Sequence, residues 1–430
     1  MNIAELYSIF QKYPVISTDS RNCPGNALFF ALKGDKFDGN DYIEQALESG
    51  AAYAVGDRNN LPRSERIIKV DDALRSLQDL ANYHRKQLKK PVIAITGTNG
   101  KTTTKELIAA ALSSQYPVLY TQGNLNNHIG VPLTLLQLQS GHAFAVIEMG
   151  ANHPGEIRNL CRIAEPDYGL ITNLGKAHLE GFGSFEGVVR TKTELYDFLR
   201  EKGGIIFCNS DNPLLRGLSD YLSTVYYGTT QEAFVYGTIT KSSPYLHLKW
   251  TKNEETYEIK TALAGTYNFE NVLAAICIAS YFKIENQRIN QAIENYIPLN
   301  NRSQSRKTDR NQLIIDAYNA NPSSMEAALD NFLSLPVSPR MVILGEMREL
   351  GKYSEKEHRK IVEILIQNKI DRVILVGEGF TKLTGLPEEW TVFQQTTDLI
   401  SYLAGIEIKG YTLLIKGSRG NQLEKTIDFL

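Results

Sequence analysis

The sequence predicts an α/β protein of three domains: a small α/β N-terminal domain, a central P-loop ATPase-type domain with a parallel sheet, and a C-terminal Rossmann-like α/β domain. Three observations support this prediction. The chain has 430 residues, too many for one ordinary hydrophobic core. Apolar strand patterns alternate with helical patterns, as in parallel sheets. A glycine-flanked turn joins a strand to a helix near Gly97. We expect the domain boundaries at 1–90, 91–297 and 298–430.

The composition is that of a globular enzyme. Hydrophobic residues make up 42% and charged residues 22% of the chain, and the formal net charge of −2 gives no general attraction to nucleic acid or to anionic membranes. No apolar run has membrane-spanning length. The cysteines lie far apart, without zinc spacing or a dense disulfide framework, and are expected to be buried thiols in a reducing compartment. We therefore expect a cytoplasmic protein without a nucleic-acid partner or membrane insertion.

Residues 1–90 are expected to form the small N-terminal domain. Its expected elements are an N-terminal helix, strands over 27–32 and 52–55, and helices over 41–49 and 72–87. Two polar turns, 18–21 and 33–39, separate these elements. Asp, Ser and Gly are ordinary turn residues, so both segments fit surface turns. Arg21, beside hydroxyl and backbone donors, equally suits a diphosphate or a carboxylate.

The two following domains are expected from repeated strand and helix patterns. The central strands are 91–96, 143–147, 168–172 and 204–208, with an antiparallel hairpin within 234–261 and a helix over 268–281. Polar residues follow the last three of those strands, at the edge where open parallel sheets bind ligands. The expected C-terminal strands are 313–315, 341–344, 372–376 and 411–415. No G-x-G-x-x-G motif follows the first of them, so a dinucleotide site is not indicated.

The stretch 91–104 carries the clearest chemical signal. An apolar β-branched run ends in a glycine-flanked turn, followed by Lys101-Thr102-Thr103 and a helical pattern. In a phosphate-binding loop the backbone N–H groups face the phosphates, the lysine reaches the β and γ oxygens, and a hydroxyl holds Mg²⁺. The usual first glycine of this motif is replaced by Ile95. A chance Gly-Lys-Thr after a strand is therefore the alternative.

Two more residues, Glu148 and His178, are candidates for metal chemistry, whereas Lys192 is not marked out by its neighbours in the sequence. Glu148 closes an apolar strand, where a carboxylate needs a partner, and Mg²⁺ beside a P-loop or a salt bridge would supply one. His178 follows a strand at the same sheet edge, and we interpret it as a ligand, although a lone histidine is more often structural. Lys192 lies in a helical stretch whose apolar side carries Val188, Leu195 and Phe198. That pattern alone predicts an ordinary surface lysine.

The segment from Thr96 to Thr103 resembles the ATP loop of the Mur ligase family, which also includes the folylpolyglutamate synthetases. Further matches run from end to end: 19–21, 37–39, 123–132, 148–151, 173–183, 316–325, 345–351, His358 and 416–419. The Asn-rich stretch 123–132 and the run from Tyr318 to Pro322 are most similar to members that add D-alanyl-D-alanine to UDP-N-acetylmuramoyl-tripeptide. The chain departs from the family at Tyr267, where relatives commonly carry His.

The resemblance implies a role for each matched position. The catalytic set would be Lys101, Glu148, His178 and Lys192. ATP would be bound by Gly97, Thr98, Asn99, Gly100, Lys101, Thr102, Thr103, Asn268, Asn271, Arg302 and Asp316. Two Mg²⁺ ions would be held by Thr102, Glu148, His178 and Lys192, the last as a CO2-derived carbamate, which a lowered lysine pKa would favour. The other substrates would contact Ser20, Arg21, Asn126, Asn127, Tyr318, Asn319 and Asn321.

The implied activity is ATP-dependent amide ligation through an acyl phosphate, giving the pentapeptide precursor of peptidoglycan. The expected partners are UDP-N-acetylmuramoyl-tripeptide and D-alanyl-D-alanine, and a monomer is expected. The alternative within the family is a diaminopimelate- or lysine-adding ligase, or a folylpolyglutamate synthetase. A P-loop switch or motor is a remote alternative, because the chain lacks the basic, aromatic-interleaved patch of a nucleic-acid partner.

Overall fold

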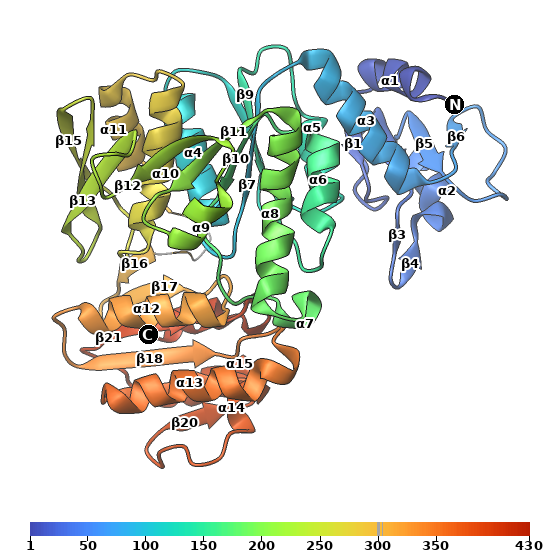
Figure 1. Ribbon diagram of the computed structural model, residues 1–430. Coiled ribbons are helices and arrows are strands. Elements are labelled where there is room, and N and C mark those ends of the chain that lie inside the picture. Colours follow the sequence, from blue (N-terminus) through green and yellow to red (C-terminus); the bar gives the residue numbers. More distant parts are fainter. Residues whose placement is uncertain (299–301, 303) are drawn as a thin grey trace.

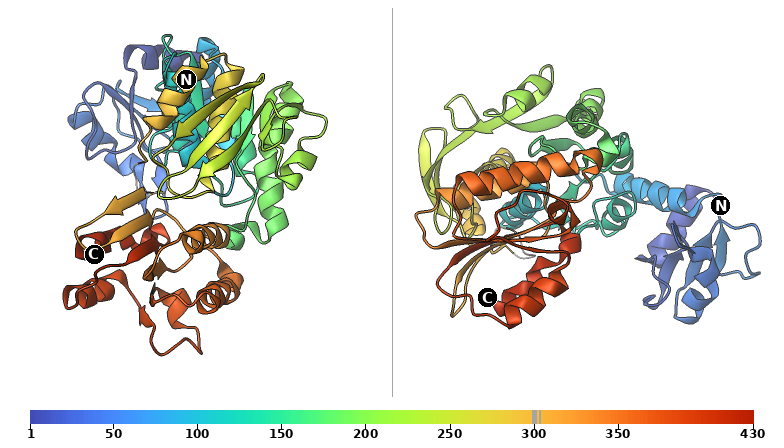
Figure 2. Two further views of the ribbon diagram at one scale, coloured as in Figure 1. Left: turned by 90° about the vertical axis from the view of Figure 1, so that its left-hand side faces the viewer. Right: turned by 90° about the horizontal axis from the view of Figure 1, so that it is seen from below.

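The computed structural model describes residues 1–298, 302 and 304–430. The chain forms three α/β bodies, with the N-terminal and C-terminal bodies on different sides of the central one (Figures 1 and 2). The predicted fold class is confirmed. Residues 299–301 and 303, near the predicted start of the third domain, lie outside the described residues.

The N-terminal body is a parallel sheet with helices against both faces. Its strands, in the order β1-β2-β5-β6, are β1 (Val15–Ser17), β2 (Ala27–Phe30), β5 (Tyr53–Gly56) and β6 (Ile67–Lys69). Its remaining elements are α1 (Ile3–Lys12), η1 (Gly39–Tyr42), α2 (Ile43–Glu48) and the hairpin of β3 (Lys33–Gly34) and β4 (Phe37–Asp38). Strand β2 is wholly buried because alternate residues enter different cores. Leu28 packs in the cluster of α1, and Phe29 packs in the cluster of α2.

Helix α3 (Ala73–Leu88) connects the N-terminal body to the central one (Figure 1). Asp72 caps its start by accepting a hydrogen bond from the Arg75 N–H at 2.8 Å. The helix packs on α1 and also on two helices of the central body, α5 (Gly130–Leu135) and α6 (Glu156–Ala164). Near its end, Arg85 forms an ion pair with Asp167 at 2.7 Å. The same helix therefore belongs to the packing of both bodies.

The central body is built on one large sheet of order β15-β14-β13-β12-β11-β10-β7-β9-β8. The strands are β7 (Val92–Thr96), β8 (Val118–Tyr120), β9 (Phe144–Glu148), β10 (Tyr168–Ile171), β11 (Ile205–Asn209), β12 (Ser223–Gly228), β13 (Val235–Lys241), β14 (His247–Lys252) and β15 (Glu255–Lys260). The remaining helices are α4 (Lys101–Ser113), α7 (Leu179–Phe182), α8 (Phe185–Lys202), α9 (Pro213–Leu218), α10 (Asn268–Tyr281) and α11 (Asn286–Glu294). Pairing is parallel from β8 to β13, and the predicted antiparallel hairpin is confirmed as β13-β14-β15.

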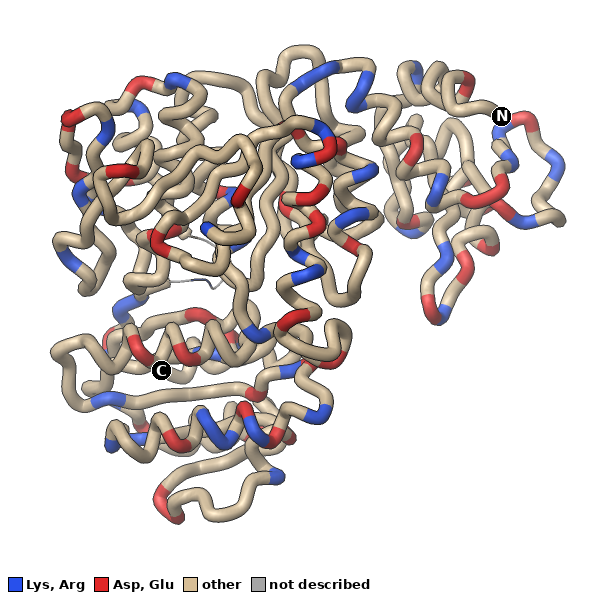
Figure 3. Tube along the Cα trace, viewed as in Figure 1, with Lys and Arg blue, Asp and Glu red and all other residues tan. Residues whose placement is uncertain are grey.

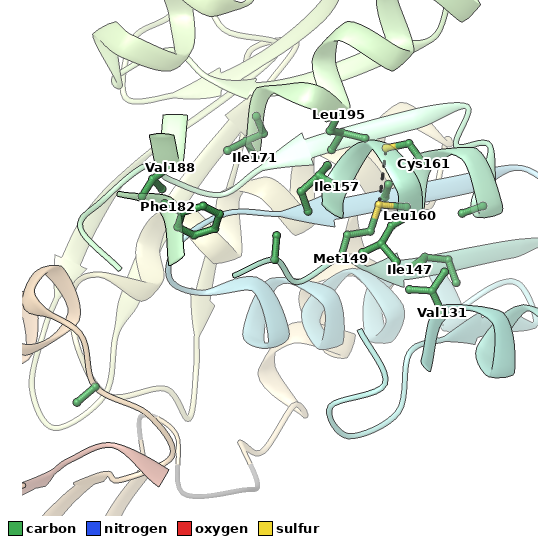
Figure 4. Close-up of a cluster of buried hydrophobic side chains, with 14 of the residues drawn as sticks. Val131, Ile147, Met149, Ile157, Leu160, Cys161, Ile171, Phe182, Val188 and Leu195 are labelled. Atoms are coloured by element: carbon green, nitrogen blue, oxygen red, sulfur yellow. Dashed lines mark hydrogen bonds between the residues drawn. The ribbon is translucent and has the colours of Figure 1, made fainter. Parts of the chain in front are cut away.

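The central strand β7 explains why this sheet is covered on both faces. Ile93 and Ile95 enter the core made with α4 and α10, whereas Val92 and Ala94 enter the core made with α5, α6 and α8. Figure 4 shows part of that second core. Ile147 lies in β9 and Met149 directly follows that strand, whereas Ile157, Leu160 and Cys161 come from α6. Cys161 Sγ and Met149 Sδ lie 3.9 Å apart there. The end of β7 is thus held rigidly where the phosphate-binding loop begins.

The C-terminal body is a second layered unit below the central one (Figure 1). Its sheet has the order β16-β17-β21-β18-β19-β20, parallel except for the antiparallel edge strand β16. The strands are β16 (Gln304–Lys307), β17 (Gln312–Asp316), β18 (Arg340–Gly345), β19 (Arg372–Val376), β20 (Thr391–Phe393) and β21 (Thr412–Lys416). The helices are α12 (Pro322–Ser334), η2 (Gly351–Tyr353), α13 (Ser354–Gln367), α14 (Glu378–Thr381), α15 (Thr396–Ala404), η3 (Arg419–Asn421) and η4 (Leu423–Phe429).

Charged residues of both signs are interspersed over all three bodies (Figure 3). In the part of the chain that the structure describes, no helix combines the length and apolarity needed to cross a bilayer. The four cysteines are buried free thiols, as the sequence predicted.

Candidate active site

A cavity of about 850 Å³ lies where the phosphate-binding loop faces the C-terminal body. It brings together most of the residues that the sequence singled out. Those lining it are Thr98, Asn99, Gly100, Lys101, Thr102, Thr103, Asn126, Asn127, Glu148, His178, Asn268, Asn271, Arg302, Asp316, Tyr318, Asn319 and Asn321. The central and C-terminal bodies both contribute to this wall, so the site is complete only when the two lie together.

The loop between β7 and α4 has a backbone that requires glycine at two positions. Gly97 has φ of 142° and Gly100 has φ of 78°, both outside the range that other residues adopt easily. A side chain at Gly97 would overlap the Thr172 hydroxyl, and one at Gly100 would come within 2.6 Å of Asn271 Oδ1. The tight turn therefore depends on both glycines, and it directs the N-terminus of α4 into the cavity.

Lys101 is the first residue of α4 and lies deep in this loop. Its Nζ donates hydrogen bonds to the carbonyls of Gly97, at 2.7 Å, and Thr98, at 3.0 Å. Burial, with a smaller contribution from the charge of Arg302, lowers the pKa of Lys101 to about 8, although Glu148 acts in the opposite direction. The half-buried ammonium has two carbonyls as partners and no carboxylate bonded to it among the described residues, and a phosphate would supply the missing negative charge.

Glu148 ends strand β9 and is only 2% exposed. Its Oε1 accepts a hydrogen bond from Asn126 Nδ2 at 2.8 Å, and its backbone N–H donates to the Thr121 hydroxyl at 2.9 Å. Its Oε2 is buried and has no hydrogen-bond partner among the described residues. An unpaired carboxylate oxygen facing a cavity beside a threonine-rich helix start fits a Mg²⁺ ligand.

The residues around Glu148 also fit Mg²⁺ better than a metal ion whose ligands all come from the protein. Among the described residues, no three His, Cys, Asp or Glu side chains gather into a metal-binding group. Mg²⁺ is usually held by one or two carboxylates with water and substrate phosphate oxygens. Glu148 and the Thr102 hydroxyl are the protein groups in the cavity that could bind such an ion.

His178 and Lys192, the other two metal candidates, have different surroundings. His178 has a positive φ of 50°, and its Nδ1 contacts the carboxylate of Glu349 from the C-terminal body. Lys192 does not line the cavity, and its Nζ lies 5.7 Å from the centroid of the Phe182 ring. Among the described residues its ammonium makes no hydrogen bond or ion pair. Burial, and then the charge of Lys101, lower the pKa of Lys192 well below its usual value.

The residue pattern of α8 was misleading about Lys192. That pattern predicts a surface lysine, but the side chain is only 1% exposed. The prediction was wrong because α8 is packed on several sides, against α6, α7 and strands β10 and β11. Burial of Lys192 favours its neutral amine, the form that reacts with CO2, although the charge of Glu156 acts in the opposite direction.

The far side of the cavity is formed by α10 and the C-terminal body. Asn271 accepts a hydrogen bond from the Thr104 hydroxyl at 3.0 Å and donates one to Asn268 Oδ1 at 3.0 Å. The guanidinium carbon of Arg302 lies 3.6 Å from the centroid of the Tyr318 ring. The carboxylate of Asp316 pairs with the buried Lys416. Stacked and amide-rich walls of this kind suit a planar base and a ribose.

The remaining predicted residues lie elsewhere or have internal partners. Ser20 and Arg21 are in the N-terminal body and do not line the cavity. The Ser20 hydroxyl donates to Gln45 Oε1 at 3.3 Å, and Arg21 pairs with Asp19, whose pKa it lowers to about 2. Asn127 lines the cavity, and its Oδ1 accepts a hydrogen bond from the Gly130 N–H at 2.8 Å, at the start of α5.

Sequence reasoning missed the contacts that join the central and C-terminal bodies. Asn321 Nδ2 donates to Asn99 Oδ1 at 2.8 Å, and the Lys176 ammonium pairs with Glu357 on α13 at 2.8 Å. Pairs separated by more than a hundred residues leave no periodic signal in a single sequence. The only indication was that Lys176 and Asn321 lie in segments 173–183 and 316–325, which match motifs of the Mur ligase family.

The fold and the cavity define a class: a three-body α/β protein whose P-loop site is closed by a separate C-terminal unit. Three family domains match the chain. Residues 12–85 match "Mur ligase family, catalytic domain", residues 95–279 match "Mur ligase middle domain", and residues 301–419 match "Mur ligase, glutamate ligase domain". The chain belongs to the Mur ligase family.

Relatives match over nearly the whole length. The UDP-N-acetylmuramoyl-tripeptide–D-alanyl-D-alanine ligases of Bacillus subtilis and Escherichia coli are 36% and 35% identical to it, and each alignment covers 96% of this chain and 92% of the relative. A crystal structure of MurF from Acinetobacter baumannii has a TM-score of 0.87 at 29% identity, covering 96% of this chain and 92% of that one. MurF ligase from Thermotoga maritima, in complex with ADP, has a TM-score of 0.85 at 26% identity, with 96% of each chain covered.

Proposed function

We propose that this protein uses ATP to join D-alanyl-D-alanine to UDP-N-acetylmuramoyl-tripeptide, giving the pentapeptide precursor of peptidoglycan. End-to-end similarity to ligases of that name supports this proposal. The structural observation that carries it is the cavity itself. A half-buried P-loop lysine, an unpaired buried carboxylate oxygen and the C-terminal body meet there, which is the arrangement needed to activate one substrate on ATP and deliver a second.

The proposed reaction has two steps. The terminal carboxylate of the tripeptide attacks the γ-phosphorus of ATP, so that a C–O–P bond forms and ADP leaves. The amine of D-alanyl-D-alanine then attacks the resulting acyl phosphate. The tetrahedral intermediate loses phosphate, and the amine proton goes to a base or to water. Both steps place negative charge on oxygens, so fixed positive charge should be the main catalytic contribution.

Lys101 and the loop N–H groups around it are proposed to bind the β and γ oxygens of ATP. The phosphates would replace the carbonyls of Gly97 and Thr98 as partners of the Lys101 ammonium. Asn268, Asn271, Arg302 and Asp316 are proposed to surround the nucleoside. Positioning by both bodies would exclude water, which would otherwise hydrolyse the acyl phosphate.

Thr102 and Glu148 are the residues proposed to hold Mg²⁺, with His178 and a carbamate on Lys192 proposed to hold a second ion. Bound Mg²⁺ would neutralise charge on the phosphate oxygens. Lys192 fits this role chemically, because burial lowers its pKa and so favours the neutral amine that adds CO2, and the carbamate would turn that amine into an oxygen ligand. The bond between Asn126 and Glu148 would orient the carboxylate for the first ion.

Each body is proposed to bind one substrate. Residues 1–90, with Ser20 and Arg21, would bind the UDP-sugar-peptide, which Asn126 and Asn127 would also contact. Residues 91–297 would bind ATP. Residues 298–430, with Tyr318, Asn319 and Asn321, would bind the dipeptide. Because one chain supplies the whole cavity, we propose that the working unit is a monomer. We also propose that it is located in the cytoplasm.

The proposal is tested by offering the purified protein Mg-ATP, UDP-N-acetylmuramoyl-tripeptide and a panel of amines. ADP release and the mass of the product are measured. We expect turnover with D-alanyl-D-alanine and not with lysine, diaminopimelate or glutamate. Turnover with a different amine would keep the mechanism and change the substrate. ATP hydrolysis that needs no amine would contradict the proposal.

A further inference from the structure

The segment that follows strand β10, residues 173–178, is bonded on one side to the phosphate-binding loop. The Thr98 N–H donates to the Asn173 carbonyl at 2.9 Å, and the Asn99 N–H donates to Asn173 Oδ1 at 2.9 Å. The Gly175 N–H donates to the Thr98 hydroxyl at 2.9 Å. The positions of Thr98 and Asn99, which line the cavity, are therefore fixed by this neighbouring segment.

On its other side, the same segment is bonded to the C-terminal body. The Lys176 N–H donates to the Ser323 hydroxyl at 2.9 Å, at the start of α12. The Lys176 ammonium pairs with Glu357 Oε1 on α13 at 2.8 Å. The approach is close enough that a side chain on Gly175 would come within 2.5 Å of the Ser323 hydroxyl. One short segment thus contacts both the phosphate-binding loop and two helices of the C-terminal body.

The ion pair between Lys176 and Glu357 is asymmetric in burial. The Glu357 side chain is 3% exposed, and its Oε2 has no hydrogen-bond partner among the described residues, whereas the Lys176 side chain is 43% exposed. A buried carboxylate is costly unless it is paired. Lys176 belongs to the central body and Glu357 to the C-terminal body, so the pair can form only when the two bodies lie together. The pair therefore stabilises that closed arrangement specifically.

We propose that Lys176 is a positioning residue, which holds the C-terminal body closed over the phosphate-binding loop through its ion pair with Glu357. The segment 173–178 links this closure to the geometry of Thr98 and Asn99. The inference rests on the proposed ligase reaction, in which the C-terminal body delivers the amine. Lys176 contacts no reacting group. Its effect should appear in the step that needs closure and not in binding of the nucleotide-sugar by the N-terminal body.

Because Glu357 is more buried than Lys176, we expect substitutions of the two residues to differ in their effect on kcat/KM. Lys176→Met leaves a carboxylate buried without its cation in the closed arrangement. Glu357→Gln leaves an ammonium that is already half exposed and that water can solvate. We therefore expect Lys176→Met to lower kcat/KM for D-alanyl-D-alanine about tenfold, a larger loss than that of Glu357→Gln. The KM for UDP-N-acetylmuramoyl-tripeptide should stay unchanged.

The chain offers a matched control on the same helix. Lys360 of α13 pairs with Glu326 of α12 at 2.7 Å, an ion pair that lies wholly within the C-terminal body. Lys360→Met removes a comparable pair and leaves the bond between Lys176 and Glu357 in place, although the charge of Lys360 also acts on Glu357. This variant should therefore lose much less kcat/KM for the dipeptide than Lys176→Met.

The experiment combines these variants of the full chain with the exchanged pair Lys176→Glu/Glu357→Lys. Steady-state kinetics are measured together with the radius of gyration from small-angle X-ray scattering, which needs no turnover. We expect a larger radius for Lys176→Met than for the wild type, and partial recovery of radius and kcat/KM in the exchanged pair. Wild-type-like scattering and kinetics in Lys176→Met would overturn the proposal. Failure of the wild type itself to use D-alanyl-D-alanine would instead count against the proposed function.

Discussion

Asn321 of the C-terminal body donates a hydrogen bond from Nδ2 to Oδ1 of Asn99 in the phosphate-binding loop, at 2.8 Å. Its other side-chain atom, Oδ1, accepts from the Ser324 N–H at 2.9 Å and caps helix α12. One amide therefore fixes the start of a helix with one atom and contacts the ATP loop with the other. A substitution can therefore remove the contact with Asn99 and keep the cap of α12.

Asn321→Asp should impair catalysis while leaving the fold intact. Aspartate keeps the oxygen that caps α12, but it lacks the N–H that donates to Asn99 Oδ1, and it adds a negative charge beside the phosphate-binding loop. We expect kcat/KM to fall about tenfold, equivalent to about 1.4 kcal/mol, with a melting temperature close to that of the wild type. Kinetics and thermal unfolding of the purified variant check this. A large drop in melting temperature with normal kinetics would show that only the cap matters.

Lys101 should give ATP use a characteristic pH dependence. Its pKa in the substrate-free protein is lowered to about 8, so the ammonium is charged below that pH and becomes neutral above it. We expect kcat/KM for ATP to fall as the pH rises through about 8. The profile of kcat should stay flat to higher pH, because bound phosphate restores the lysine pKa. In the matched variant Lys101→Met, the fall of kcat/KM for ATP near pH 8 should be absent, and the rate should be about 10²–10³-fold lower than in the wild type. An unchanged fall in Lys101→Met would assign it to another group.

Glu148→Gln should raise the Mg²⁺ requirement. Glutamine can still accept the hydrogen bond from Asn126 through Oε1, but it offers an amide nitrogen in place of the unpaired Oε2. We expect the Mg²⁺ concentration for half-maximal rate to increase at least about tenfold. Titration of Mg²⁺ at saturating ATP measures it. Glu326→Gln, on α12 but outside the cavity lining, serves as the control, and equal Mg²⁺ dependence in both variants would argue against a metal role for Glu148.

Lys192→Arg should remove the proposed carbamate while keeping a long side chain. Arginine stays protonated and cannot add CO2. We expect wild-type protein in ¹³C-bicarbonate to show a carbamate carbon resonance that is absent from Lys192→Arg. Activity should fall at least about tenfold in the variant. A wild-type spectrum without that resonance at every pH at which the protein stays folded would refute the modification.

Much of the fold could be predicted from local patterns. Helix α10 has the predicted bounds 268–281, and strand β19 has the predicted bounds 372–376, because each is a strongly apolar run with clear ends. Short edge elements were not predicted, including β1, β16 and β20. Edge strands of three or four residues bury little surface, so they carry almost no hydrophobic signal.

The site shows a similar division. Gly97, Lys101 and Glu148 could be singled out because strand ends and glycine turns are local features with direct chemical meaning. The burial of Lys192 could not be predicted from its own helix, since it depends on helices and strands that pack around α8. The pairs Asn321–Asn99 and Lys176–Glu357 depend on how two bodies sit together, which only the tertiary structure reports.

We propose that the tripeptide carboxylate is activated as an acyl phosphate in the cavity beside Lys101. An isotope experiment tests this step, with UDP-N-acetylmuramoyl-tripeptide whose terminal carboxylate carries ¹⁸O. During complete turnover with Mg-ATP and D-alanyl-D-alanine, we expect transfer of one ¹⁸O from each carboxylate into the released phosphate, seen by mass spectrometry. Product formation with unlabelled phosphate would contradict it, because the carboxylate oxygen would then never have been bonded to phosphorus.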